Sequence, residues 1–123
     1  MARWDDLASE GYTVADRLFD MGYWRSCVNR AYFAAYARTT GVLLEEGVSL
    51  PARGNPTHER LPMTVQHNLV SLSPAARARV AAALGRLYRL RIVADYGPHR
   101  RVERASARGA LGLMAQVFRE LGG

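Results

Sequence analysis

Residues 23–37, which read YWRSCVNRAYFAAYA, decide the fold class of this chain. Apolar and aromatic side chains fill most of these positions, so a helix built from them would be apolar around most of its circumference. Such a helix is either central in its bundle or shared with a partner chain. We interpret Tyr23 to Glu46 as one helix that does both, packing in the core and forming a homodimer contact through residues 23–37. Cys27 lies among these apolar residues, and we expect it to be buried as a small hydrophobe.

Helical spacing continues on both sides of this segment. Residues 4–20 carry apolar side chains at three- and four-residue steps, and Gly22 ends the amphipathic helix that they predict. Residues 102–121 show the same spacing after the break at Gly97-Pro98. No segment sustains the alternation of polar and apolar residues that a half-buried strand requires. The sequence therefore predicts an all-α fold.

The middle of the chain predicts a loop and two further helices. Residues 47–62 contain three prolines and two glycines, a density of helix breakers that indicates an exposed loop. A short helix is expected around residues 63–70, and Ser73-Pro74 then supplies a serine N-cap and a first-turn proline for a helix that runs to about Asp95. We therefore expect a single domain over residues 1–123, folded as an up-and-down bundle of four or five helices.

Composition narrows the class of protein. Of the 123 residues, 49% are hydrophobic and 23% charged, as in a globular domain, and no apolar run approaches the ~20 residues needed to cross a bilayer. The N-terminus turns acidic at Asp5-Asp6, soon after Arg3, and lacks the apolar segment of a signal peptide, so we expect a cytoplasmic protein without membrane association. The histidines and the cysteine do not have the spacing of a zinc site, and no nucleotide-binding glycine motif is present. We predict no metal and no cofactor.

Positive charge is concentrated in one region of the sequence. The net charge is +6, and all of the 17 basic residues are arginine. Residues 77–108 hold nine arginines against two acidic residues, which gives +7, whereas the rest of the chain holds eight against nine, which gives −1. A GC-rich genome explains the choice of arginine over lysine, but it does not explain this distribution.

One arginine occupies a position where the helical pattern calls for an apolar residue. The stripe formed by Val80, Leu84 and Leu87 faces inward. Four residues later the same stripe reaches Arg91, with Asp95 one turn further. A buried guanidinium needs a carboxylate, carbonyl groups or a bound anion. Two interpretations stay open: an ion pair at i and i+4 that only fixes the helix end, and a groove in which Arg91 binds a phosphate through two nitrogens.

Two further groups of arginines stand out. The first faces outward on the same helix and is expected to be a solvated surface: Arg79, Arg86 and Arg89. The second surrounds the start of the last helix, where the helix dipole disfavours cations: Arg100, Arg101, Arg104 and Arg108. A nucleic acid would remove that conflict through its phosphates. The alternatives are genomic bias and an acidic partner protein.

Three segments resemble the HEPN family. The segment Tyr23 to Tyr36, with its RAYFAAY core, resembles the second helix of compact bacterial HEPN proteins. The segment Asn55 to His58 resembles a loop of that group that carries a Thr/Ser-His pair. The segment Leu87 to Gly97, LYRLRIVADYG, resembles its L-x-x-L-R-x-x-A-D-Y-G signature. Order and spacing agree over residues 5–120.

The resemblance implies a dimeric bundle of four or five helices that cleaves RNA as a toxin or accompanies a small nucleotidyltransferase. Catalytic members carry an arginine followed, after four to six residues, by a histidine. Arg91 matches the arginine, but Tyr96 stands at the first histidine position and His99 lies beyond the last. Because tyrosine is a poor proton carrier at neutral pH, the resemblance implies RNA binding more readily than metal-independent cleavage.

Our leading hypothesis is an RNA-binding or RNA-processing module of a toxin-antitoxin or defence type, with cleavage left open. The candidate catalytic residues are Arg91, Asp95 and Tyr96. The candidate nucleic-acid-binding residues are Arg30, His58, His99, Arg100, Arg101, Arg104 and Arg108. The alternative is a non-enzymatic module that pairs with a small nucleotidyltransferase through the aromatic helix.

Overall fold

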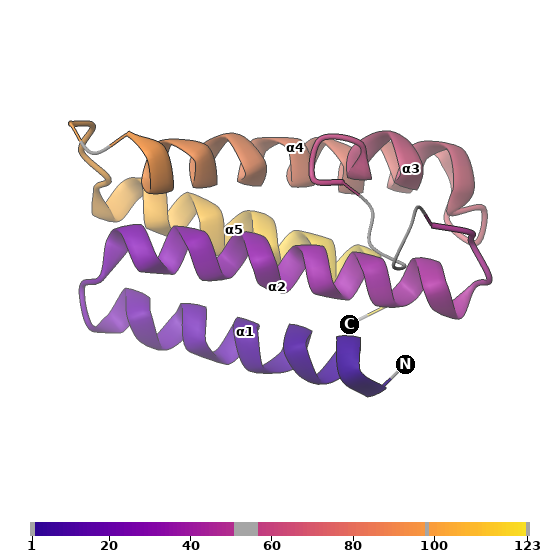
Figure 1. The fold of residues 1–123 in the computed structure, drawn as a ribbon, viewed down its shortest axis with the longest axis horizontal. Coiled ribbons are helices and arrows are strands. Elements are labelled where there is room, and N and C mark those ends of the chain that lie inside the picture. Colours follow the sequence, from indigo (N-terminus) through magenta and orange to yellow (C-terminus); the bar gives the residue numbers. More distant parts are fainter. Residues whose placement is uncertain (1, 51–56, 98, 123) are drawn as a thin grey trace.

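The protein folds as a bundle of helices. The computed structural model describes residues 2–50, 57–97 and 99–122, and all regular secondary structure in these ranges is helical. In chain order the helices are α1 (Ala2–Asp20), α2 (Trp24–Glu45), α3 (Leu61–Asn68), α4 (Pro74–Tyr96) and α5 (Arg104–Glu120). The four long helices run up and down, each antiparallel to the one before, and the short α3 lies beside the N-terminal part of α4 (Figure 1). The all-α bundle predicted from the sequence is confirmed.

The apolar helix of residues 24–45 is central in the bundle. It packs against α1, α4 and α5, and 12 of its residues are buried. Cys27 is fully buried, as expected, and burial raises the pKa of its thiol to about 11. Because α2 has neighbours on three sides within one chain, its apolar surface is largely used inside the protomer. Phe33 on α2 and Tyr23, the N-cap residue just before it, remain exposed, and the homodimer through residues 23–37 stays a prediction.

Glycine and serine set three of the helix boundaries. Gly22 and Gly47 adopt φ values of 81° and 78°, a left-handed conformation that favours glycine, and they turn the chain after α1 and α2. Ser73 caps α4 as predicted, since its hydroxyl accepts a hydrogen bond from the backbone N–H of Ala76 at 3.1 Å. Pro74 follows in the first turn, where its missing N–H costs nothing.

Two predicted boundaries differ from the structure. The short helix covers Leu61–Asn68 rather than residues 63–70, because Pro62 is accommodated in its first turn and Leu61 is fully buried. The last helix begins at Arg104, so Arg100 and Arg101 lie in the preceding turn. That turn is held by a hydrogen bond from the backbone N–H of Arg100 to the Gly97 carbonyl at 2.9 Å.

Helices α1 and α2 approach each other closely at two glycines. A Cβ atom added at Gly11 would lie 3.1 Å from the Cβ of Ala34 and 3.4 Å from its Cα. A Cβ added at Gly41 would lie 3.2 Å from the Cβ of Trp4. Gly112, on the exposed side of α5, has no such neighbour within 4 Å. The chain therefore uses glycine for close packing in one helix pair and not in every helix.

Within residues 2–50, 57–97 and 99–122, no helix is both long enough and apolar enough to cross a bilayer.

Candidate functional site

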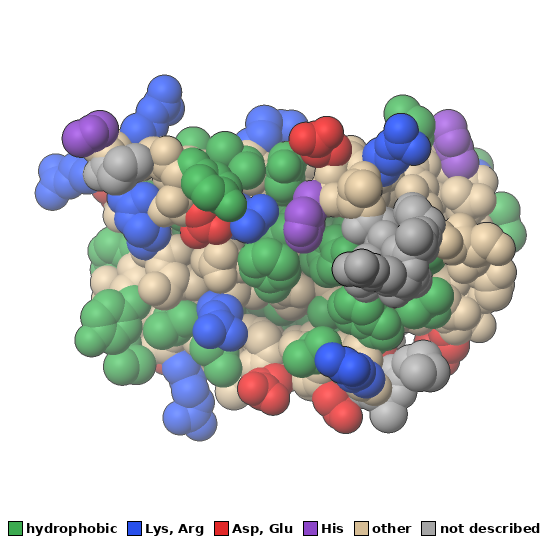
Figure 2. All heavy atoms as spheres, viewed as in Figure 1, with side chains coloured by type: hydrophobic (Ala, Val, Ile, Leu, Met, Phe, Trp, Pro, Cys, Tyr) green, Lys and Arg blue, Asp and Glu red, His purple; other side chains and the backbone are tan. Residues whose placement is uncertain are grey.

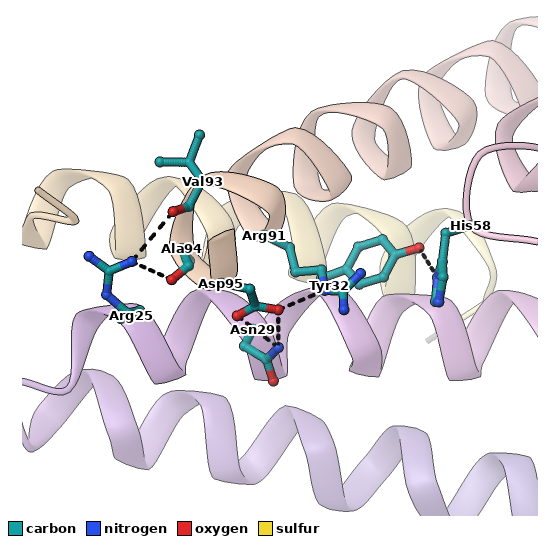
Figure 3. Close-up of polar contacts among 8 residues, drawn as sticks. All are labelled: Arg25, Asn29, Tyr32, His58, Arg91, Val93, Ala94 and Asp95. Carbon is teal, nitrogen blue, oxygen red and sulfur yellow. Dashed lines mark hydrogen bonds and ion pairs between the residues drawn. The ribbon is translucent and has the colours of Figure 1, made fainter. Parts of the chain in front are cut away.

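Arg91 lies in the seam between α2 and α4. Its side chain is 14% exposed, and its Nε donates to Oδ2 of Asp95 at 2.9 Å. Leu84 and Leu87 of the same stripe are almost fully buried. The inward position of Arg91 and its pairing one turn later, both predicted from the sequence, are therefore present. Figure 3 shows the Arg91 side chain reaching from α4 toward α2.

The carboxylate of Asp95 also receives a bond from α2. Asn29 Nδ2 donates to Oδ2 at 3.0 Å and to Oδ1 at 3.3 Å. Asp95 is thus held by a cation on its own helix and by an amide on the neighbouring helix (Figure 3). Sequence reasoning missed Asn29. The available signal was its position four residues after Arg25 in an otherwise apolar helix, which puts both polar groups on one face.

Arg25 caps the C-terminal end of α4. Its Nη1 donates to the Ala94 carbonyl and, at 3.4 Å, to the Val93 carbonyl, while its Nη2 donates to the Arg100 carbonyl at 2.8 Å. The last carbonyls of a helix have no partner within the helix, so a guanidinium from a neighbouring element satisfies them. Arg25 is therefore a structural residue whose two terminal nitrogens are already engaged.

Aromatic rings surround the guanidinium of Arg91. Its Cζ lies 5.0 Å from the ring centroid of Phe33 and 5.8 Å from those of Tyr32 and Tyr96. The Phe33 ring is 37% exposed and the Tyr96 ring 68% exposed, whereas Tyr32 is buried. These distances are in the range of cation–π contacts. The guanidinium plane is consequently held by rings from both helices as well as by the carboxylate.

The terminal nitrogens of Arg91 are open to a ligand. Only Nε is engaged by Asp95, and neither Nη has a hydrogen-bond partner among the described residues. In the described part of the chain, the buried side-chain nitrogens and oxygens without a partner are Arg38 Nε and Thr40 Oγ1 alone. Neither Nη atom of Arg91 belongs to that pair of buried atoms, and the Arg91 side chain keeps 14% of its surface exposed. An edge with two parallel N–H groups is the arrangement that binds a phosphate bidentately.

His58 joins the same cluster from the segment before α3. Its Nδ1 lies 2.7 Å from the Tyr32 hydroxyl (Figure 3). Its ring centroid lies 5.7 Å from that of Phe33 and 4.8 Å from that of Tyr36. Tyr32 is 1% exposed, so the one hydrogen of its hydroxyl needs an acceptor, and Nδ1 is the acceptor within reach. The neutral imidazole then carries its own hydrogen on Nε2, an assignment that follows from hydrogen bonding.

The surroundings favour neutral forms of both rings. Burial, and then the nearby Arg91 charge, lower the pKa of His58 below its ordinary value of 6.5. Burial is the main reason that the pKa of the Tyr32 hydroxyl is raised, with a smaller opposing effect of Arg91. At neutral pH the pair is therefore an un-ionised phenol that donates to a neutral imidazole, whose Nε2 is a donor.

Titration of His58 is expected to report on Arg91. In an NMR titration the midpoint of the His58 ring should lie below 6.5, and the substitution Arg91→Met should move it upward, because one of the two causes of the lowered pKa is removed. The unfolded chain takes up this proton near the ordinary pKa and the folded chain only at a lower one. The stability gained from neutral His58 is complete above the unfolded-state pKa and is lost as the pH falls through the folded-state pKa. An unchanged midpoint in Arg91→Met would contradict the contact.

The remaining predicted site residues lie away from this seam cluster, which we define as Asn29, Tyr32, His58, Arg91 and Asp95, flanked by Phe33 and Tyr96. Arg30 is exposed on α2 and makes no described contact with the cluster. His99, Arg100 and Arg101 are exposed in the turn between α4 and α5. The structure thus joins Arg91, Asp95, Tyr96 and His58 and leaves the other predicted residues elsewhere.

The arginines around the start of α5 form a separate patch at one end of the bundle. Arg104 and Arg108 both lie over the ring of Phe19, with their Cζ atoms 5.1 and 5.4 Å from its centroid. Arg101 is 90% exposed and lies 3.9 Å from Glu103. Because only Arg104 and Arg108 are in the first turns of α5, the predicted conflict with the helix dipole is smaller than the sequence suggested. The end of the bundle with the α4–α5 turn carries several basic side chains in Figure 2.

The outward-facing arginines of α4 behave differently from one another. Arg79 is paired with Glu120 of α5 through both its Nε and its Nη2, which raises the pKa of Arg79 and lowers that of Glu120. Arg86 and Arg89 are exposed and have no ion pair among the described residues. Within the same residues no group of three or more His, Cys, Asp or Glu side chains has the geometry of a metal site.

No protein-family model matches the chain, and no curated protein is significantly similar to it. The HEPN resemblance therefore remains an expectation from the sequence motifs, and the chemistry of the site follows from its side chains. The seam cluster contains the imidazole of His58 and a guanidinium whose two Nη groups have no hydrogen-bond partner among the described residues, and the Asp95 carboxylate holds that guanidinium in place. Figure 2 shows acidic, basic and histidine side chains next to one another near the middle of the face drawn, with hydrophobic side chains around them. Such an arrangement suits an anion next to an apolar or aromatic group.

Proposed function

We propose that this chain is an RNA-binding module of the HEPN type, in which Arg91 binds a backbone phosphate. The observation that carries the proposal is the state of the Arg91 guanidinium. Its Nε is fixed by Asp95, while neither Nη has a hydrogen-bond partner among the described residues and the side chain is 14% exposed. An ion pair that only fixed the helix end would need the Nε of Arg91 alone. Here the unpaired Nη groups also lie beside the exposed residues Phe33 and Tyr96.

The distribution of charge supports a nucleic acid as the ligand. One phosphate bound by Arg91 gives little affinity alone, but the arginine patch at the α4–α5 end adds long-range attraction for a polyanion. Aromatic rings beside a phosphate-binding arginine also fit a single strand, whose unstacked bases bind aromatic faces. RNA is the nucleic acid that the motif resemblance implies.

The protonation of His58 argues for binding over cleavage. Metal-independent RNA cleavage needs a base that removes a proton from the ribose 2′-hydroxyl. The Nε2 of His58 carries a hydrogen when Nδ1 accepts from Tyr32, so it donates to a phosphate oxygen and does not act as that base. Tyr96 stands where the motif resemblance expects the histidine, and its ring centroid lies 5.8 Å from the Cζ of Arg91, so no second imidazole is available there.

The proposal is tested by RNA binding across a salt series and by RNA integrity in EDTA. We expect the purified chain to bind labelled single-stranded RNA with an affinity that falls steeply between ~50 and ~200 mM salt, and to leave the RNA intact. Salt-insensitive binding, or no binding at the lowest salt, would refute the phosphate contact. Robust cleavage in EDTA that Arg91→Ala abolishes would replace the binding role with a catalytic one.

A second candidate function is a protein-interaction module for a small nucleotidyltransferase. The observation that favours it is the exposure of Tyr23 at the start of α2 and of Phe33 on α2, at 56% and 37%. Exposed aromatic residues of this kind are enriched in protein interfaces. A gene for such an enzyme beside this one, together with partner binding lost in a Tyr23→Ser, Phe33→Ser variant and RNA affinity that salt does not change, would favour this function.

A further inference from the structure

A groove between α3 and α4 continues from the seam cluster. It has a volume of about 580 Å³, and its lining includes His58, Tyr88 and Gly85. His58 therefore belongs both to the surroundings of Arg91 and to this groove. In Figure 3 it stands at the end of a row that runs from Arg91 past Tyr32. The volume lies within the ~300–1,000 Å³ typical of small-molecule sites.

The floor of the groove is made of residues with almost no side chain. Ala78, Ala81, Ala82 and Gly85 follow one another at three- and four-residue spacing along one face of α4. Gly85 does not serve close helix packing. A Cβ added there would meet only Arg89 Nη1, at an ordinary 3.5 Å, in contrast to the tight contacts at Gly11. Glycine inside a helix costs up to ~1 kcal/mol relative to alanine, and here it leaves room in the groove.

The walls of the groove have the chemistry of a nucleobase site. Tyr88 and His58 both line the groove as a stacked pair, with ring centroids 6.0 Å apart and planes inclined by only 12°. The guanidinium of Arg89 lies back over Gly85, and that of Arg86 lines the rim. Arginine and aromatic planes are the surfaces on which unpaired bases stack. Glu59 also lines the groove, and its carboxylate disfavours a second phosphate there while it can accept from the amino group of a base.

We propose that this groove takes an unstacked base of the RNA strand whose phosphate binds Arg91. The inference rests on the proposed function and deepens it, since it names single-stranded RNA as the substrate class. The phosphate lies between the Arg91 Nη edge and His58 Nε2, and the base on one side of it enters the groove against Tyr88. The rim arginines Arg86 and Arg89, which have no ion pair among the described residues, match the charge of a strand that passes over the groove.

The test compares two probes, a fluorescent oligo(A) RNA and an oligomer of the same length with abasic riboses. For the wild type we expect oligo(A) to bind about 10- to 100-fold more tightly than the abasic strand, the usual range for loss of base stacking. Gly85→Leu fills the groove and should reduce oligo(A) affinity toward that of the abasic strand without changing the abasic affinity. Gly112→Leu places the same side chain on open surface of α5 and should change neither value.

The outcomes separate this inference from the proposed function. Arg91→Met should weaken both probes, whereas Gly85→Leu should weaken only the one with bases. If Gly85→Leu binds oligo(A) like the wild type, or if the wild type binds both probes equally, the base site is refuted while the phosphate site stands. If Arg91→Met also changes nothing, the proposed function fails. Ala82→Leu, an exposed position on the same floor, gives a second groove-filling variant should Gly85→Leu not fold.

Discussion

Replacing Arg91 with methionine is expected to weaken binding of single-stranded RNA by about 10- to 100-fold, the loss that follows from removing a charged hydrogen-bonding group. Methionine keeps much of the side-chain volume in the seam but removes both Nη donors. The slope of log affinity against log salt should also fall by about one, since one phosphate contact is lost. Fluorescence anisotropy with labelled RNA at several salt concentrations measures both quantities.

Asp95→Asn is the matched control for this prediction. Asparagine keeps an oxygen for Arg91 Nε and for Asn29 but removes a negative charge close to the bound phosphate. If Arg91 binds phosphate, RNA affinity should stay the same or rise in Asp95→Asn. If Arg91 only fixes the helix end through its ion pair, both variants should lose stability and neither should change RNA affinity. Thermal unfolding of each variant shows which part of the effect belongs to the fold.

Replacing Gly11 with leucine is expected to lower the free energy of unfolding by ~2–3 kcal/mol, the range for overpacking a tight contact. Even a Cβ at this position would approach the Cβ and Cα of Ala34 to 3.1 and 3.4 Å, and the backbone of α2 cannot move aside locally. The remaining atoms of leucine would have to separate α1 from α2. For a domain of this size the loss corresponds to a fall in Tm of roughly 10 °C, measurable by circular dichroism.

Gly112→Leu is the control, and its effect should have the opposite sign. No atom lies within 4 Å of a Cβ at Gly112, so leucine gains helix propensity there without a clash. We expect its free energy of unfolding to equal or exceed that of the wild type. Equal destabilisation by the two substitutions would show that the α1–α2 contact is less tight than these distances indicate.

The contacts between residues of one helix, such as the ion pair of Arg91 and Asp95, were predictable from the sequence. The spacing of Leu84, Leu87 and Arg91 on one helix fixes the direction of the guanidinium, and Asp95 is its neighbour because residues four apart share a face. The fold class followed in the same way from the apolar helix of residues 24–45, whose central position accounts for its composition.

The part of the site that depends on how helices pair was not predictable. Asn29 and Arg25 belong to α2 and contact the C-terminal end of α4 and the residues after it. The spacing of residues within α2 does not indicate which helix packs against this face. His58 was named from the motif, but its bond to Tyr32 depends on how the segment before α3 folds back over α2. The sequence prediction placed the start of α5 too early. In the structure the Arg100 carbonyl accepts a hydrogen bond from Arg25, 75 positions away in the sequence, and such a contact is not visible in local spacing.

The three carbonyl contacts of Arg25 also bear on how the domain assembles. The last turn of α4 completes its hydrogen bonding only when a side chain of α2 reaches it. An isolated α4 would fray at this end, and its final turn, which carries Asp95, would become ordered together with the α2–α4 interface. The last turn of α4 and the contact between α2 and α4 are therefore expected to form in one cooperative step. The ion pair between Arg91 and Asp95 is then complete only after the two helices have packed together.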